Sequence, residues 1–363
     1  MRSSINLKLL PLKKLADHKL NVLVTAVGGR SVGSGILHSL TRSSQDVSDR
    51  WNVVAADADS FAWGLYKVED GEILPKANEA DYIQKVQELV RRRLIDAIVP
   101  GSEIETEILS KYRGEFNVPI ISNRSDLMPL MMNKSQALIR LKELGLPTIP
   151  TFSLNDWETA LSEYDFPFVF KPIVGSGGSK GVSICTSKEE FLHLATRANW
   201  SENFCLQPLV GDENGEYTVG VLMNKDGGLI DSICMQRKLV GLSLLDSRKV
   251  GEVSHSISTG YSQGFFIKQE RIQKFCEKLA LDLGSTGPLN IQLRIHQDQV
   301  YVFEIHPRFS GTTPMRADVG FNEVDLLLRN HLFEEEFSRI PYKHDVAVIR
   351  AFEHVIVPID KLK

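Results

Sequence analysis

Short apolar runs alternate with amphipathic stretches along the first third of the chain. The strand-like and helix-like runs follow one another at 21–27, 35–40, 51–57, 81–93 and 96–100. Alternating strands and helices are typical of a parallel sheet, because parallel strands need a crossover connection. The pattern therefore predicts a first domain, a parallel α/β domain over residues 1–125.

The pattern changes after residue 125. An amphipathic helix is expected at 134–144, and the strands that follow it have antiparallel character. The later runs lie at 166–173, 182–185, 187–199, 204–210, 216–223, 269–283 and 290–308. We predict a second domain over 126–363 with two α+β lobes, of which 150–210 is a small lid. We expect the Ser- and Gly-rich stretch 243–265 to be a mobile loop.

Composition excludes several classes of function. The net charge is -4 and the basic residues are dispersed, so no nucleic-acid partner is expected. The four cysteines form no C-x-x-C pair, which argues against a zinc site and a disulfide framework. Lysines interrupt the apolar runs of the first 20 residues, and no later run reaches membrane-spanning length. We therefore expect a cytoplasmic protein without a membrane partner.

Two glycine clusters stand out. The first, at 28–35, lies between a strand and a helix, where backbone N–H groups can bind an anion. It does not match the G-x-G-x-x-G dinucleotide pattern, although Asp57 stands where a ribose-binding acid is found in that motif, so a tight structural turn is favoured.

The second glycine cluster follows Lys171, which lies on a predicted strand. Small residues let main-chain amides close over phosphates, and a lysine supplies a point charge to them. It is not a Walker A loop, and a plain Gly-rich hairpin turn remains an equal alternative. The cluster consists of Gly175, Ser176, Gly177, Gly178 and Ser179.

The predicted hairpin 290–308 gathers polar side chains on one face. If it turns about Asp298, Gln292 lies opposite Glu304 and Asn290 opposite His306. Side chains alternate between the two faces of a strand, so Arg294 and Arg308 lie on the same face as these four residues. The apolar residues between them face a core: Ile291, Leu293, Ile295, Tyr301, Phe303 and Ile305. Carboxylate and amide oxygens with arginines fit a magnesium and phosphate site, and a solvated outer sheet face is the alternative.

With these segments the sequence resembles the ATP-grasp superfamily, most closely the carbamoyl-phosphate-synthase-like branch that also contains amino-acid ligases. The resemblance covers nearly the whole chain, from the segment 22–29 to the motif Pro307-Arg-Phe-Ser-Gly-Thr-Thr313. It implies a fold class: a pre-ATP-grasp parallel α/β domain followed by a two-lobed α+β ATP-grasp fold. It also implies ATP and Mg²⁺, or Mn²⁺, as cofactors.

The resemblance assigns roles residue by residue. As nucleotide-binding residues we expect Lys134, Lys171, Gly175, Ser176, Gly177, Gly178, Ser179, Gln207, Leu209, Val210, Glu216 and Phe303. Within that set, the resemblance implies that the strand 205–210 contacts the edge of the adenine and that Glu216 binds the ribose hydroxyls. As metal ligands we expect Gln292, Glu304 and His306, and as catalytic residues Arg308, Lys171 and Arg294. Arg294 and Arg316 are candidates to bind a substrate carboxylate in a bidentate manner, and His255 is a candidate to touch the acceptor. For Arg316 and His255, a surface ion pair and a solvated loop residue are alternatives of at least equal weight.

Two departures from the family pattern limit the prediction. His306 stands where the family usually has Asn, and Gly311 stands where carbamoyl phosphate synthases have a second Arg. The sequence therefore predicts an ATP-dependent ligase that joins a small carboxylate or amino acid to an amine or other nucleophile through an acyl phosphate, in a chain that we also consider as a homodimer. The alternatives are a kinase-like subunit that only phosphorylates a carboxylate, and a catalytically silent ATP-binding regulatory protein.

Overall fold

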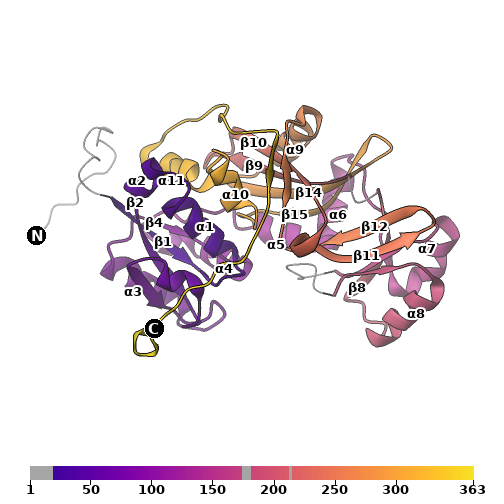
Figure 1. Ribbon diagram of the computed structural model, residues 1–363, viewed down its shortest axis with the longest axis horizontal. Coiled ribbons are helices and arrows are strands. Elements are labelled where there is room, and N and C mark those ends of the chain that lie inside the picture. Colours follow the sequence, from indigo (N-terminus) through magenta and orange to yellow (C-terminus); the bar gives the residue numbers. More distant parts are fainter. Residues whose placement is uncertain (1–18, 174–180, 212–214) are drawn as a thin grey trace, which may run out of the picture.

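The computed structural model describes residues 19–173, 181–211 and 215–363. The predicted phosphate loop of Gly175, Ser176, Gly177, Gly178 and Ser179 lies outside these ranges. The three larger sheets of the described residues follow one another along the longest axis, with the N-terminal sheet at one end and the lid sheet at the other (Figure 1).

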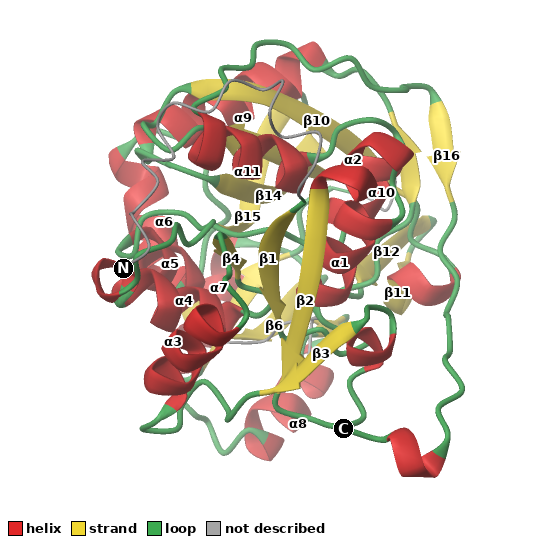
Figure 2. Ribbon diagram, turned by 90° about the vertical axis from the view of Figure 1, so that its left-hand side faces the viewer, coloured by secondary structure: helices red, strands yellow, loops and turns green. Residues whose placement is uncertain are grey.

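The N-terminal sheet is parallel and has the order β3-β2-β1-β4. Its strands are β1 (Leu20–Thr25), β2 (Trp51–Asp57), β3 (Asp70–Ile73) and β4 (Ala97–Val99). Helices α1 (Val32–Thr41) and α2 (Gln45–Arg50) lie on one side, and α3 (Tyr82–Arg92) and α4 (Glu103–Lys111) on the other (Figure 2). Helices therefore cover both faces of the sheet, which agrees with the parallel α/β domain that the alternating strands and helices predicted.

The central sheet is antiparallel and has the order β15-β14-β9-β10-β13-β16. Its strands are β9 (Glu216–Met223), β10 (Leu229–Arg237), β13 (Gly264–Phe266), β14 (Pro288–His296), β15 (Gln299–His306) and β16 (Val346–Val348). One face packs on α5 (Leu127–Met132), α6 (Lys134–Glu143) and α9 (Glu270–Asp282). The helices α10 (Thr313–Asp318) and α11 (Glu323–Phe333) follow the hairpin.

The lid is a small antiparallel sheet with two helices. Its order is β5-β8-β6-β7, and its elements are β5 (Phe152–Ser153), α7 (Trp157–Glu163), β6 (Phe168–Pro172), β7 (Ser183–Cys185), α8 (Lys188–Arg197) and β8 (Phe204–Pro208). Short 3-10 turns occur at Trp63–Tyr66, Arg113–Glu115, Leu154–Asp156, Gly241–Ser243 and Ile359–Lys361.

The stretch 243–265 is not an irregular loop. It contains the hairpin β11 (Leu244–Val250) and β12 (Val253–Ser258), which turns at Gly251 with a φ of 61°. Glycine adopts this left-handed conformation without strain, so the Gly that suggested a loop instead closes a tight turn between two strands.

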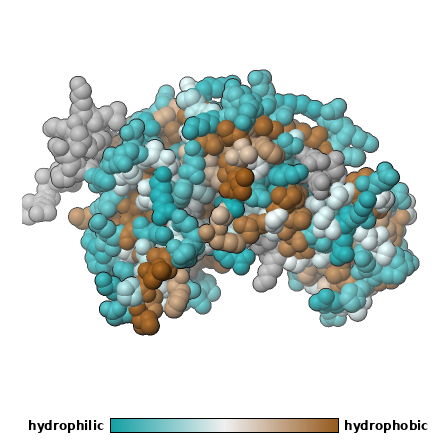
Figure 3. Space-filling view, in the orientation of Figure 1, coloured by the Kyte–Doolittle hydropathy of each residue, from teal (hydrophilic) through white to brown (hydrophobic). Residues whose placement is uncertain are grey.

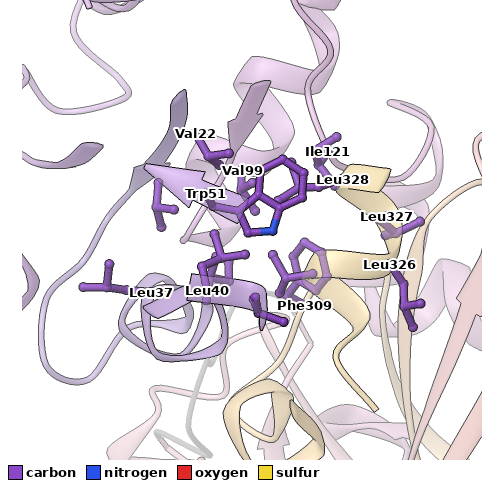
Figure 4. Close-up of a cluster of buried hydrophobic side chains, with 14 of the residues drawn as sticks. Val22, Leu37, Leu40, Trp51, Val99, Ile121, Phe309, Leu326, Leu327 and Leu328 are labelled. Carbon is purple, nitrogen blue, oxygen red and sulfur yellow. The ribbon is translucent and has the colours of Figure 1, made fainter. Parts of the chain in front are cut away.

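One hydrophobic core joins the N-terminal sheet to the C-terminal helices. Leu37, Leu40 and Trp51 pack with Phe309 and Leu327 (Figure 4). The indole Nε1 of Trp51 also donates a hydrogen bond to Asp325 Oδ1 at 2.8 Å. The cluster draws residues from both sides of position 125, so the N-terminal sheet is held firmly against the rest of the molecule; the boundary itself stays a prediction.

The outer surface differs from this core. The face in Figure 3 is mostly hydrophilic, with hydrophobic patches between the polar areas. None of the helices in the described ranges combines the length and the apolar character needed to cross a membrane.

The first glycine cluster has a structural role. A Cβ on Gly33 would lie 2.2 Å from Ala26 O, and one on Gly101 would lie 1.9 Å from Thr25 O. Asp57 accepts a hydrogen bond from Gly28 N at 3.0 Å, so its carboxylate holds the turn. The tight-turn interpretation is therefore the one that the contacts support.

We predict that Gly33→Ala lowers the free energy of unfolding by roughly 2–4 kcal/mol, because the added methyl group overlaps backbone atoms that cannot move independently. Gly114→Ala is the matched control, since a Cβ there meets nothing within 4 Å. Chemical denaturation of both variants measures the difference. Equal stability of the two variants would show that the start of α1 can move away from Thr25 and Ala26 without cost.

Candidate functional site

Two clefts meet beside the central hairpin. The first, which we call the lobe cleft, encloses about 730 Å³ of empty space, including the part open to solvent. It is lined by Lys134, Ile149, Val169, Lys171, Val182, Gln207, Pro208, Leu209, Val210, Glu216, Ile257, Ser258, Gln292, Arg294, Phe303 and Glu304. The second, the polar cleft, encloses about 500 Å³ and is lined by Thr218, Arg237, Thr259, Gly260, Ser262, Asn290, Gln292, Glu304, His306, Arg308, Ser310, Gly311 and Thr312. Gln292 and Glu304 line both.

The register of β14 and β15 agrees with the prediction at the end of the hairpin away from the turn, where the predicted site residues lie. Gln292 pairs with Glu304, and Asn290 pairs with His306. Nearer the turn the register shifts, because Leu293 pairs with Val302 and Phe303 has no partner in the ladder. Such a bulge turns the following side chains to the other face.

The bulge corrects one part of the predicted pattern. Val300 and Val302 face the core, and the expectation that Tyr301 and Phe303 do so is wrong. Phe303 instead lines the lobe cleft, where its ring joins Ile149, Val169 and Ile257 as an apolar wall. Phe303 is one of the expected nucleotide-binding residues, and that role stays a prediction.

Glu304 is held by two polar neighbours. Gln292 Nε2 donates a hydrogen bond to Glu304 Oε2 at 2.8 Å, and His306 Nε2 lies 3.3 Å from the same oxygen. Burial acts to raise the pKa of Glu304, but the charge and hydrogen bond of His306, with the charges of Lys134 and Lys171, outweigh it and lower the pKa to about 2. Glu304 is therefore an ionised carboxylate between the two clefts.

Two lysines face the lobe cleft from different elements. Lys134 is the first residue of α6, where the side chain of Asn133 caps the helix by accepting from Ser135 N and Gln136 N. Lys171 comes from β6 and is 7% exposed. Burial lowers the pKa of Lys171, and the positive charge of Lys134 acts in the same direction. A helix N-terminus and two cations make this end of the cleft suited to phosphates.

The end of β8 supplies the other wall. Gln207, Leu209 and Val210 all line the lobe cleft, and Gln207 Nε2 donates to Thr151 Oγ1 at 2.5 Å. Leu209 N is already bonded to Pro167 O at 3.0 Å. Apolar side chains with a few polar groups are the usual lining of a small-molecule pocket.

Glu216 lies at the centre of a buried charge cluster. Its Oε1 accepts from Arg237 Nη1 at 2.9 Å, and its Oε2 accepts from Arg294 Nη2 at 2.8 Å. Burial acts to raise the pKa of Glu216, but the two guanidiniums outweigh it, so the net shift is downward. Arg237, which sequence analysis missed, also donates to Gln292 Oε1 at 3.2 Å. It therefore links Glu216 to one of the expected metal ligands.

Three expectations about the substrate are corrected. Arg294 already binds Glu216 through two nitrogens and also donates to Ser256 O, so it is not free to grip a substrate carboxylate in a bidentate manner. Arg316 is 2% exposed, is paired with Glu323 at 3.0 Å, and lines neither cleft. His255 lies on the β11–β12 hairpin and also lines neither cleft.

Glu103 is a second residue that the sequence did not reveal. It begins α4 in the N-terminal domain, and both Nε and Nη2 of Arg308 donate to its Oε1. His306 Nδ1 lies 3.6 Å from the same oxygen. Burial acts to raise the pKa of Glu103, and Arg308 and His306 reverse the effect. The N-terminal domain therefore holds two side chains of the hairpin motif.

The sequence offered little sign of these two residues. Arg237 ends a strand that the sequence did not predict, and Glu103 follows a Ser that caps a helix, which by itself indicates only a helix start.

The predicted metal ligands lie together. Gln292, Glu304 and His306 are joined by the contacts above, at the point where the clefts meet. Within the described residues no group of three or more His, Cys, Asp or Glu side chains is arranged to hold a metal by itself. An amide oxygen and one carboxylate with additional ligands from phosphates fit magnesium, which is seldom bound by protein groups alone.

Two family models match the chain. The model described as ATP-grasp in the biosynthetic pathway with Ter operon matches residues 213–355, and the one described as PylC-like, N-terminal domain matches residues 22–121. The carbamoyl phosphate synthase large chain of Helicobacter pylori is 22% identical over 78% of this chain, which spans 28% of that relative's length.

Solved structures share the fold. The N5-carboxyaminoimidazole synthetase of Staphylococcus aureus, solved with ADP, has a TM-score of 0.63 at 14% identity, with 90% of this chain and 81% of that chain covered. The L-amino acid ligase of Bacillus licheniformis has a TM-score of 0.60 at 17% identity, with 86% and 74% covered. The predicted fold class, a pre-ATP-grasp parallel α/β domain followed by a two-lobed α+β ATP-grasp fold, is confirmed.

We predict that Glu216→Gln lowers the free energy of unfolding by roughly 3–5 kcal/mol, because it leaves the buried guanidiniums of Arg237 and Arg294 without their counter-charge. The control is Glu353→Gln, which removes the partner of Arg42 from a site where the side chain of Glu353 is 55% exposed. That variant should lose less than about 1 kcal/mol. Chemical denaturation compares the two, and an equal loss would refute the central role of Glu216.

Proposed function

We propose, from the premise that the chain belongs to the ATP-grasp superfamily, that it is an ATP- and magnesium-dependent ligase. In this proposal it joins a small carboxylate or amino acid to an amine or another nucleophile through an acyl phosphate. The observation that carries the proposal is the position of Glu304 and Gln292, which line both the lobe cleft and the polar cleft. A phosphoryl group passing from one cleft to the other would move past these two side chains.

We assign the lobe cleft to ATP. The adenine would lie between Phe303 and the end of β8, and Lys134 and Lys171 would contact the phosphates. Glu216 would take the ribose hydroxyls; each of its oxygens already accepts from an arginine, and a carboxylate oxygen has a second lone pair to offer. The expected phosphate contacts of Gly175, Ser176, Gly177, Gly178 and Ser179 stay a prediction, because these residues lie outside the described ranges.

We assign the metal to Gln292, Glu304 and His306. When bound, Mg²⁺ or Mn²⁺ would neutralise charge on the phosphate oxygens. Glu304 suits this role because its pKa of about 2 keeps it ionised at neutral pH. His306 is held from its other ring nitrogen by Arg308 at 3.3 Å, which fixes the ring's orientation towards Glu304.

The proposed chemistry has two steps. A carboxylate oxygen of the substrate attacks the γ-phosphorus of ATP, the bond from that phosphorus to ADP breaks, and an acyl phosphate forms. The amine nitrogen then attacks the acyl carbon, phosphate leaves, and the nitrogen loses its proton. The residues contribute positioning and charge: Lys134 and Lys171 on the nucleotide side and Arg308 on the substrate side. The homodimer and the cytoplasmic location stay predictions.

A screen for ADP release tests this function. The isolated chain with ATP and Mg²⁺ should release ADP only with certain pairs of carboxylate and amine, and mass spectrometry should find the condensed product. Glu304→Ala should abolish turnover while keeping nucleotide binding, because it removes a metal ligand and leaves the adenine wall intact. ADP and acyl phosphate without a condensed product would indicate the kinase-like subunit, and ATP binding without turnover would indicate the regulatory protein.

We predict that His306→Asn retains turnover and shifts metal preference from Mn²⁺ towards Mg²⁺. A neutral imidazole suits transition metals better than magnesium, whereas an amide oxygen suits magnesium. Turnover rates at saturating concentrations of each metal give the ratio for the variant and the wild type. If the variant loses activity with both metals and still binds ATP, His306 acts on phosphate or substrate instead of on the metal.

A further inference from the structure

We propose that the polar cleft accepts a carboxylate substrate with a second anionic group, a carboxylate or a phosphate, and that Arg350 and Arg30 bind this group. The inference rests on the proposed function, since it names the substrate class of the same site. Both arginines lie outside the motifs that the sequence singled out. Their place in the structure, their charge and the residues that line the cleft carry the argument.

The polar cleft reaches both the reacting centre and the glycines beside Arg350. Its lining includes the expected metal ligands Gln292, Glu304 and His306. It also includes Gly260 and Gly311, next to which the Arg350 guanidinium lies. A substrate that fills the cleft would therefore extend from the reacting carboxylate towards Arg350.

The guanidiniums deep in the cleft already have counter-charges. Arg237 is paired with Glu216 at 2.9 Å, and Arg308 is paired with Glu103. These arginines can bind the reacting carboxylate and the phosphoryl group through their remaining donors. Because they are already paired with carboxylates, they do not by themselves indicate that the substrate carries a second negative charge.

Arg350 and Arg30 differ in this respect. Arg350 donates to the backbone oxygen of Gly311, and Arg30 Nε donates to the hydroxyl of Tyr261 at 2.8 Å. Their guanidinium carbons lie 5.7 and 5.6 Å from the centre of the Tyr261 ring. Among the residues that the structure describes, neither guanidinium forms an ion pair with a carboxylate. Two uncompensated positive charges are thus held on one aromatic side chain.

Arg350 lies directly behind the wall of the polar cleft. Its Nη1 would be 3.9 Å from a Cβ on Gly311, and Gly311 and Gly260 both line the cleft. A larger residue at 311 would also meet Gly260 O, at 3.2 Å. The absence of a side chain at Gly311 therefore brings the Arg350 guanidinium close to the cleft. Burial lowers the pKa of Arg350; Tyr261 acts to raise it, and the charge of Arg237 acts to lower it. A bound anion would favour the charged form of Arg350.

The chain path explains how these groups meet. The segment after β16 leaves the central sheet and crosses to the N-terminal domain (Figure 1). Phe352 packs on Tyr261 with ring centres 5.7 Å apart, and Glu353 bonds Arg42 of that domain at 2.8 Å. Arg30 comes from the glycine-rich loop before α1. The second anion would therefore bind where the N-terminal domain, the β12–β13 connection and the C-terminal segment meet.

Binding is measured by isothermal titration with a non-hydrolysable ATP analogue and Mg²⁺ present. The acids are succinate against butanoate, glutamate against glutamine, and 3-phosphoglycerate against glycerate. We expect the doubly charged member of at least one pair to bind roughly tenfold tighter or more, the scale of a charge-assisted bidentate contact. The pair that shows the preference distinguishes a carboxylate from a phosphate. No preference in any pair, or no binding of any acid at millimolar concentration, overturns the inference.

Variants assign the preference to the two arginines. Arg350→Gln should remove most of the preference for the doubly charged acid, and Arg350→Lys should restore part of that preference. Arg30→Gln should also reduce the preference, and because Arg30 is exposed this variant should fold normally. Arg91→Gln, at an exposed site on α3, is the matched control and should change nothing. A preference that survives in both Arg350→Gln and Arg30→Gln overturns the assignment. If the doubly charged acids bind more tightly but no acid causes ADP release, the ligase proposal is refuted and this inference stands. If only singly charged acids cause ADP release, the ligase proposal stands and this inference is refuted.

Discussion

The antiparallel register of β14 and β15 is the constraint on which the site depends. It places Gln292 beside Glu304, where the amide donates to the carboxylate at 2.8 Å, and this pair stands at the junction of the two clefts. A one-residue slip would turn the carboxylate into the core, because side chains alternate between the faces of a sheet. The bulge at Phe303 uses that same rule locally: it turns an aromatic ring into the lobe cleft while Val302 fills the core.

Charge is distributed unevenly around this hairpin. Glu216, at the start of β9, accepts hydrogen bonds from both Arg237 and Arg294, so each of these buried charges is hydrogen-bonded to an opposite charge. The lobe cleft, by contrast, brings Lys134 and Lys171 together, and their mutual effect helps lower the pKa of Lys171. A protein interior can hold such an excess of positive charge where a polyanionic ligand supplies the balance. The charge pattern thus agrees with a nucleotide on one side of Glu304.

The N-terminal domain takes part in the site through a rigid junction. The shared core of Trp51, Leu40 and Phe309 fixes the parallel sheet against the C-terminal helices. As a result α4 presents Glu103 to Arg308 and His306 at hydrogen-bond and ion-pair distances. Because interiors are close-packed, a change in that core would move Glu103 relative to the hairpin. The domain therefore supports, through Glu103, two side chains that line the polar cleft.

The sequence by itself determined the local features. Period-two alternation between 290 and 308 predicted the pairing of Gln292 with Glu304, and apolar runs predicted the strand limits 51–57. It did not determine the bulge, the hairpin within 243–265, or the partners of Arg237 and Arg308. Arg308 meets Glu103 across 205 positions of the chain. Periodicity describes neighbours a few residues apart, so contacts between distant segments were decided only when the sheets packed into one core.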